Sequence, residues 1–177
     1  PLYLVEKGKS RVYLKDAEAL DSYLIDAGLA HATLTLHDGA QVAARELKTL
    51  IEKAAQLTAT VSQFALKIGP VSFVEQAVLS GIFGVDEQGL KAAVQKLEKR
   101  LDGLALDYEK GWKVTLGEDH KVTATRTLRG ITETHHIDKI AQGSIEAKKI
   151  ADLINDIGSY FEGPLTLRLK DEPLKIS

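Results

Sequence analysis

The sequence contains no cysteine and no methionine, and aromatic residues make up only 6% of its 177 residues. Without cysteine the chain can form no disulfide, no thiolate metal site and no cysteine nucleophile. It has no apolar run near the ~20 residues that a membrane-spanning helix requires, and no secretory leader, so we expect a cytoplasmic protein without membrane contact. Methionine is absent even at position 1, which indicates a piece excised from a longer protein or, alternatively, processing at a small first residue.

An excess of either charge is lacking as well. The chain has 23 Lys and Arg against 25 Asp and Glu, a formal net charge of −2. Dedicated nucleic-acid modules usually carry a clear basic excess on one face. Any contact with DNA is therefore expected to be local or to depend on partners. The apolar share of 44% and the charged share of 27% are typical of a globular protein.

Residues 1–28 predict a β-hairpin followed by a helix. Two weakly alternating apolar runs flank Gly8, which can take the positive φ of a tight turn. Asp16 is a suitable N-cap for the helix, and Gly28 is expected to end it. The run "ATLTLH" then predicts a short strand that closes in a turn at "HDG".

Apolar residues between Ala43 and Ile68 recur at alternating intervals of four and three, the spacing of a coiled-coil seam. This spacing predicts one helix from about residue 40 to residue 68, ended by Gly69 and Pro70. The seam consists of Ala43, Leu47, Leu50, Ala54, Leu57, Val61, Phe64 and Ile68.

Two further segments, 71–82 and 86–101, have a similar helical spacing, and Asp86 can cap the second. We therefore predict a helical hairpin or short bundle over residues 40–101, with Leu50 and Leu57 buried against residues 71–101. The alternative is a dimerisation zipper, which the presence of matching helices in the same chain disfavours.

After Gly103 the apolar period changes to two. Around Trp112, in "KVTATRTLR" and in "ITETHHI", alternation predicts a three-stranded antiparallel meander. A helix beginning near Ser144 and a strand from Leu165 follow. The predicted fold class is α+β, with a long helical hairpin or small helix bundle and a small antiparallel sheet.

The sequence carries none of the familiar catalytic or cofactor motifs. It has no phosphate-binding loop, no His-Glu-x-x-His helix, no acidic calcium loop and no nucleophile elbow. His135, His136 and Asp138 could be drawn as metal ligands, but adjacent residues of a strand point to opposite faces. We interpret the histidines as ordinary strand residues and assign no catalytic, cofactor-binding or metal residue.

A group of basic residues in and around the predicted meander could contact DNA or a protein partner. Alternation places Lys113 and Arg126 on opposite faces, so the group does not form one continuous stripe. The alternative is a solvated rim of the sheet, partly neutralised by nearby carboxylates. The candidate residues are Lys110, Lys113, Lys121, Arg126 and Arg129.

The opening "PLY-x-V-x-x-GK" followed by "YLKD-x-x-ALDSYLI" resembles the stretch of DNA gyrase B subunits that leaves the TOPRIM domain. Later segments follow the order of the large insertion found in many Gram-negative members of this family. They are "ARELKTLIEKAAQ", "WKV", "RTLRGITETHHID" and "GSIEAKKI". The resemblance implies that residues 1–28 are a TOPRIM tail and residues 29–177 an insertion domain, with a helical part at 40–101 and a sheet and helix part at 104–177.

The family consists of ATP-dependent type II topoisomerases that introduce negative supercoils. Its ATP-binding residues, magnesium-binding carboxylates and catalytic tyrosine have no matching positions in this sequence. The resemblance therefore implies a non-catalytic scaffold without cofactors, whose partners are other gyrase B domains, the gyrase A protein and, through the complex, DNA. A stand-alone nucleic-acid-binding module is the alternative, but Trp112, Tyr108 and Tyr3 are few residues for a stacking platform. The third possibility is an enzyme, but the sequence contains no catalytic group of residues that supports it.

Overall fold

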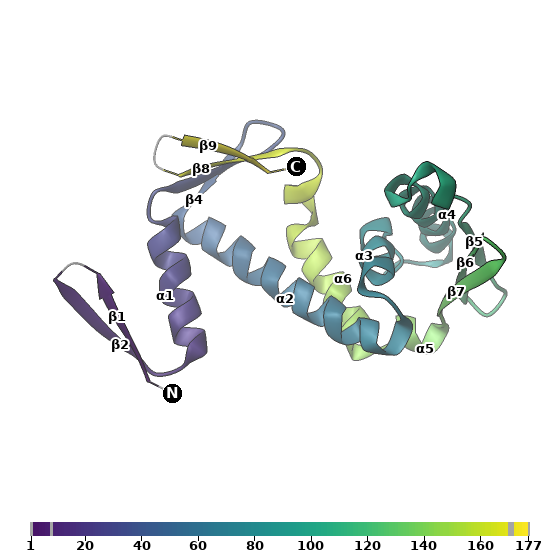
Figure 1. The fold of residues 1–177 in the computed structure, drawn as a ribbon, viewed down its shortest axis with the longest axis horizontal. Helices are drawn as coiled ribbons and strands as arrows, with labels where there is room; N and C mark the ends of the chain where they lie inside the picture. Colours follow the sequence, from purple (N-terminus) through teal and green to yellow (C-terminus); the bar gives the residue numbers. More distant parts are fainter. Residues whose placement is uncertain (1, 8, 170–171, 177) are drawn as a thin grey trace. The chain divides into compact units, whose positions relative to one another are not determined.

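The computed structural model describes residues 2–7, 9–169 and 172–176, without the side chains of residues 7, 44 and 172–176 (Figure 1). Helices and small antiparallel sheets make up the described chain, which confirms the predicted α+β class. The chain divides into two compact units. The first comprises residues 1–53 and 157–177, and the second comprises residues 54–156. In the described part of the chain, no helix is long and apolar enough to cross a membrane.

The first unit begins with the predicted hairpin, in which β1 (Tyr3–Lys7) and β2 (Ser10–Leu14) pair antiparallel. The predicted turn residue Gly8 lies outside the described residues. Asp16 caps α1 (Ala17–Leu29) as expected, because its Oδ1 accepts the N–H of Ala19 at 2.8 Å. The helix does not end at Gly28. It continues to Leu29, and the right-handed conformation of its C-cap requires no glycine.

A second sheet in this unit joins strands from opposite ends of the sequence. Its order is β4–β3–β8–β9, and all neighbours are antiparallel. The strand predicted from Leu165 is confirmed, and it pairs with the strand predicted at "ATLTLH". The four strands are β3 (Ala32–Thr35), β4 (Gln41–Ala43), β8 (Leu165–Leu169) and β9 (Glu172–Ile176).

The predicted long helix is confirmed as α2 (Ala44–Ile68), which ends at the predicted residue, but it begins at Ala44 and not near residue 40. A turn at Gly39, with φ of +86°, brings Val42 opposite Leu34, and both side chains are buried in the sheet. Sheet pairing therefore takes precedence over helix formation in β4. Ala43 is an exposed strand residue and not part of the seam.

The apolar seam of α2 contributes to both units. Leu47 and Leu50 are buried in the first unit, whereas Phe64 is buried in the second, with Leu57 half-buried against the same core. The prediction that Leu50 packs against residues 71–101 is therefore wrong. Heptad spacing identifies the apolar face of a helix, but it does not identify which element covers each turn.

The second unit packs helices against one face of a three-stranded sheet of order β5–β6–β7, which confirms the predicted meander. A short 3₁₀ helix, η1 (Asp107–Glu109), precedes the sheet, and another, η2 (Gly158–Phe161), follows α6 into the first unit. The strands are β5 (Lys113–Leu116), β6 (Val122–Leu128) and β7 (Ile131–Ile137). The helices are α3 (Val71–Ser80), α4 (Glu87–Leu104), α5 (Lys139–Gln142) and α6 (Ile145–Ile157).

Helix α5 was not predicted. It explains the role of Asp138, which is a helix cap. The Oδ1 of Asp138 accepts the N–H of Ala141 at 2.7 Å, which caps the helix. The helix predicted from Ser144 is confirmed as α6, and the Ser144 hydroxyl accepts the N–H of Ala147 at 3.2 Å.

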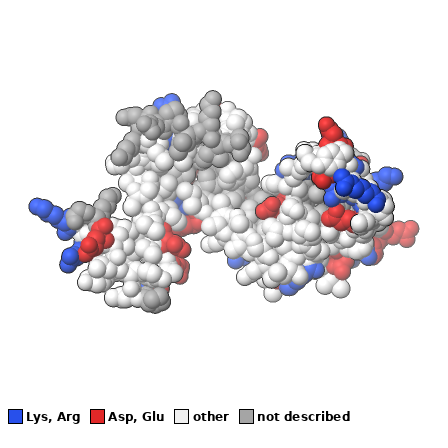
Figure 2. All heavy atoms as spheres, in the orientation of Figure 1, with Lys and Arg blue, Asp and Glu red and all other residues white. Residues whose placement is uncertain are grey.

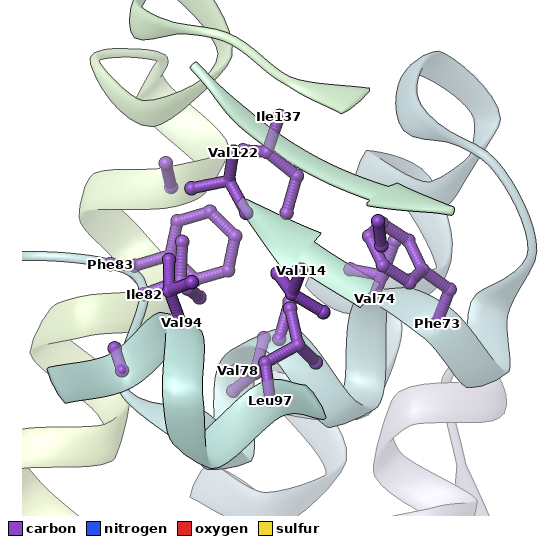
Figure 3. Close-up of a cluster of buried hydrophobic side chains, with 14 of the residues drawn as sticks. Phe73, Val74, Val78, Ile82, Phe83, Val94, Leu97, Val114, Val122 and Ile137 are labelled. Carbon is purple, nitrogen blue, oxygen red and sulfur yellow. The ribbon is translucent and has the colours of Figure 1, made fainter. Parts of the chain in front are cut away.

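The core of the second unit lies between the inner face of the sheet and the helices. Figure 3 shows Val114, Val122 and Ile137 of the sheet close to side chains of α3 and α4. Among the described residues, the largest fully buried side chains are Phe64, Ile82, Leu97, Ile137, Ile150, Val74 and Val122. This core covers one face of the sheet and leaves its other face to solvent.

Candidate functional site

The basic residues predicted to make contacts do not share one surface. Val114, Val122, Ala124 and Ile137 are buried and define the inner face of the three-stranded sheet. The side chains between them point to the opposite, outer face. Arg126 follows Ala124 by two residues and belongs to the inner face, while Lys113 is exposed on the outer face. The predicted separation of these two residues is confirmed.

Arg126 is held in place by three different contacts on the inner face. Its Nη2 donates to Glu133 Oε2 at 2.8 Å, and its Nη1 donates to the carbonyl oxygen of Glu109 at 3.0 Å. Its guanidinium carbon lies 4.7 Å from the ring centroid of Trp112, in a cation–π contact. With a side chain only 18% exposed, Arg126 holds β6, β7 and the chain before β5 together.

His135 belongs to the same inner network. Its ring contacts the rings of Phe73 and Trp112, at centroid distances of 4.8 and 6.0 Å. Its Nε2 lies 2.7 Å from Glu133 Oε1. Because a carboxylate only accepts hydrogen bonds, Nε2 carries the proton and donates it. Glu133 therefore joins Arg126 and His135, one through each carboxylate oxygen.

This network predicts a specific dependence of stability on pH. The hydrogen bond from His135 is the largest cause that holds the pKa of Glu133 below its ordinary value of 4.5, and Arg126 acts in the same direction against partial burial. A lowered folded-state pKa stabilises the fold above the ordinary pKa, and the contribution is lost as the pH falls through the folded value.

We therefore expect Glu133→Gln to be less stable than the unmodified protein at neutral pH, with a difference that shrinks below pH 4.5. Denaturant unfolding between about pH 3 and pH 6 measures this difference directly. A difference that stayed constant over the whole range would contradict the role assigned to the carboxylate.

His136 points to the outer face, where its Nδ1 lies 3.1 Å from the hydroxyl oxygen of Thr123. The two neighbouring histidines are thus on opposite faces, as the strand alternation predicted. Asp138 is occupied as the cap of α5. In the described part of the chain no group of three or more His, Cys, Asp and Glu side chains could hold a metal ion.

The remaining candidate residues occupy three different places. Lys110 forms an ion pair with Asp107 of η1 at 2.6 Å. Lys121 directly precedes β6, next to the turn that contains Glu118 and Asp119. Arg129 is exposed in the β6–β7 turn, where its φ is +50°. On the face of the molecule shown in Figure 2, basic and acidic side chains are interspersed and form no unbroken basic area.

Trp112 is unsuited to stacking on a nucleic-acid base. It is only 7% exposed, Arg126 covers one part of its ring system, and His135 is stacked against it. Tyr108 is exposed, but it lies in η1 and not on the sheet. The sheet therefore lacks the aromatic platform on which single-stranded nucleic acids usually stack.

A hollow of about 280 Å³ lies beside the inner network, between α3, the end of α4 and the sheet. Its charged side chains are largely engaged with one another, since Glu133 binds both Arg126 and His135. Gln76, only 8% exposed, accepts the Nε–H of Arg100 at 2.9 Å. We therefore interpret these groups as structural.

Sequence reasoning missed two features of the sheet. The role of Glu133 as a bridge depends on side-chain geometry that strand alternation does not reveal. The outer face was recognisable, because the threonines of "KVTATRTLR" and "ITETHHI" recur with period two. Their common orientation toward solvent could have been inferred from the apolar residues between them.

Comparison with known proteins finds relatives that share one name. No protein-family model matches it. The DNA gyrase B subunit of Caulobacter vibrioides is 30% identical over 172 residues, which are 97% of this chain and 20% of that protein. The DNA gyrase B subunit of Rickettsia felis is 29% identical over 181 residues, 99% of this chain and 22% of that protein. The Rickettsia bellii protein of the same name is 27% identical over 181 residues, with the same coverage.

The chain thus spans about one fifth of the length of the curated relatives it matches. The match extends over nearly every residue of the chain, including the hairpin, the helices and the three-stranded sheet. This agrees with the resemblance carried by the opening "PLY" stretch and the later motifs. The chain is therefore similar over nearly its whole length to a segment that makes up about one fifth of DNA gyrase B subunits, as a fragment of such a protein would be.

Proposed function

We propose that the chain is a non-catalytic region of a gyrase B protein, which acts as a scaffold for contacts between domains and subunits and for DNA handling by the complex. One observation carries the proposal: similarity covers 97–99% of the chain but only 20–22% of its relatives. A segment of a topoisomerase that lacks recognisable catalytic motifs is best explained as a positioning element.

In this proposal residues 1–28 are the tail of a TOPRIM domain, and residues 29–177 are an insertion domain with parts at 40–101 and 104–177. The exposure of the first segment supports the division. Among its described residues none is buried, and Leu4, Tyr13 and Leu24 are 47%, 66% and 53% exposed. A lone hairpin is marginally stable in water, so a hairpin and helix that bury so little favour a covering neighbour.

The proposed partners are the other domains of gyrase B, the gyrase A protein and DNA held by the assembled complex, in the cytoplasm. We assign no cofactor to the chain, because the resemblance puts ATP and magnesium elsewhere in the family. Contacts with DNA or a partner are proposed among Lys110, Lys113, Lys121, Arg126 and Arg129. The inner position of Arg126 and the ion pair of Lys110 favour the other three for direct contact.

Two activity measurements test the proposal. The isolated chain is expected neither to hydrolyse ATP nor to relax or supercoil DNA. The full-length protein from which residues 29–177 are removed, joined by a short flexible linker, is expected to lose most of its supercoiling activity when assembled with gyrase A, while its basal ATP hydrolysis persists. Activity of the purified isolated chain would contradict the non-catalytic assignment. Full supercoiling by the shortened protein would contradict the scaffold.

A further inference from the structure

The outer face of the three-stranded sheet has an unusual side-chain composition. Eight positions of the strands point outward, and six of them are threonine. The other two are Lys113 and His136, and none is Asp or Glu, although the chain has 25 acidic residues. We define the outer face by these positions: Lys113, Thr115, Thr123, Thr125, Thr127, Thr132, Thr134 and His136.

One row of this face combines a cation with two free hydroxyls. Lys113 of β5 lies opposite Thr125 of β6, which lies opposite Thr134 of β7. Neighbouring strands are about 4.8 Å apart, so the row spans the sheet in a straight line. Within the described part of the chain, these three side chains have no hydrogen-bond or ion-pair partner. By contrast, Thr127 and Thr132 are hydrogen-bonded to each other at 2.9 Å.

The composition of the outer face favours one class of partner over another. Protein interfaces are usually centred on aromatic or large apolar side chains, and none of the exposed large apolar residues among those described lies on this face. Lysine and threonine are instead common donors to phosphate oxygens. The absence of carboxylates from the face removes the repulsion that a phosphate backbone would otherwise meet. Lys121 adds a second cation beside β6.

We propose that the outer face binds the sugar–phosphate backbone of duplex DNA, with Lys113 and Lys121 as the charged contacts and Thr125 and Thr134 as hydroxyl donors. This inference rests on the proposed function and names the surface through which the scaffold touches DNA. Contacts to phosphate without base-specific groups give binding that depends on salt and not on sequence. The acidic turn at Glu118 and Asp119 limits the contact at one end of the sheet.

The experiment uses the full-length protein assembled with gyrase A and a duplex oligonucleotide, with Kd measured over a series of salt concentrations. Replacing Lys113 and Lys121 together with alanine is expected to reduce the slope of log K against log salt by about 1.8, since each lost phosphate contact removes roughly 0.9. Lys110→Ala is the control, because Lys110 is paired with Asp107 and is not on the outer face. It should leave the slope unchanged.

A second variant tests whether the threonine hydroxyls contact DNA or whether the threonines only favour strand formation. Thr125→Val with Thr134→Val keeps the shape and the β propensity of both positions but removes two hydroxyls. It should raise Kd about threefold to tenfold at every salt concentration with an unchanged slope. Thr127→Val with Thr132→Val is the matched control, because these hydroxyls bind each other and removing both is nearly neutral.

Unchanged Kd and slope in both test variants, with normal unfolding curves, would overturn the proposal. Reduced supercoiling with unchanged DNA binding would also overturn it, because the face would then contact a protein. Either result leaves the scaffold role standing. A different result would contradict the scaffold role, namely full supercoiling by the protein that lacks residues 29–177. That result does not depend on how the lysine and threonine variants bind DNA.

Discussion

Replacing Phe64 with alanine is expected to lower the free energy of unfolding by about 3–5 kcal/mol, the usual cost of removing a fully buried aromatic side chain. Phe64 has no exposed surface, and its ring meets that of Phe83 edge to face at 5.4 Å. The loss combines the transfer of the ring, the cavity that remains and the aromatic contact. Because Phe64 lies in the second unit, the unfolding of that unit should show the effect.

The only tryptophan, Trp112, is buried in the same unit, so its fluorescence during denaturant unfolding is a suitable probe. Leu66→Ala is the control. Leu66 lies two residues further along α2 and is 89% exposed, so its replacement should change the free energy of unfolding by less than about 0.5 kcal/mol. If both variants lost equal stability, burial in the core would not explain the result, and the described core would be wrong.

Arg126→Ala is expected to destabilise the second unit by about 2–4 kcal/mol, from the loss of charge-assisted hydrogen bonds and a cation–π contact. The change leaves the carbonyl oxygen of Glu109 without its donor and removes one of two partners of Glu133. The buried Nε of Arg126 has no hydrogen-bond partner among the described residues. This unpaired donor reduces the contribution of Arg126 to the stability of the native protein. Arg126→Lys should recover only part of the loss, because lysine lacks the planar fork and stacks less well.

Lys113→Ala serves as the opposite control, since Lys113 is exposed on the outer face and should affect stability by less than about 0.5 kcal/mol. Arg126 and Lys113 are therefore expected to affect different measurements. Arg126 should change unfolding curves more than the salt dependence of DNA binding, and Lys113 should do the reverse. A stable Arg126→Ala variant with weakened DNA binding would mean that the inner network opens in the complex.

Much of the second unit was predictable, because its elements are consecutive and its apolar periods are clear. The spacing of apolar residues changes from alternating intervals of four and three to intervals of two, and this change predicts where the helices end and the β5–β6–β7 meander begins. The same reasoning predicted that His135 and His136 face opposite ways. It could not predict that the ring of His135 contacts those of Phe73 and Trp112, because these contacts join separate elements whose packing no local pattern encodes.

The first unit was harder to predict because its sheet depends on distant pairing. Ala43 continues the heptad spacing of α2, yet pairing with β3 holds residues 41–43 in a strand. Likewise, Leu165 begins a strand that any local pattern recognises, but nothing near it in the sequence indicates that it belongs beside β3. Tertiary context decides such cases, since strand formation depends on an available neighbour.

The pairing of β3 with β8 also affects how the chain can fold. Thr33 pairs with Arg168, so one strand ladder closes a loop of about 130 residues, at an entropic cost of about 4 kcal/mol or more. The β6–β7 ladder, by comparison, closes across a two-residue turn. A cut in the backbone within residues 54–156 would turn the β3–β8 pairing into an association of two separate chains, whose strength depends on concentration.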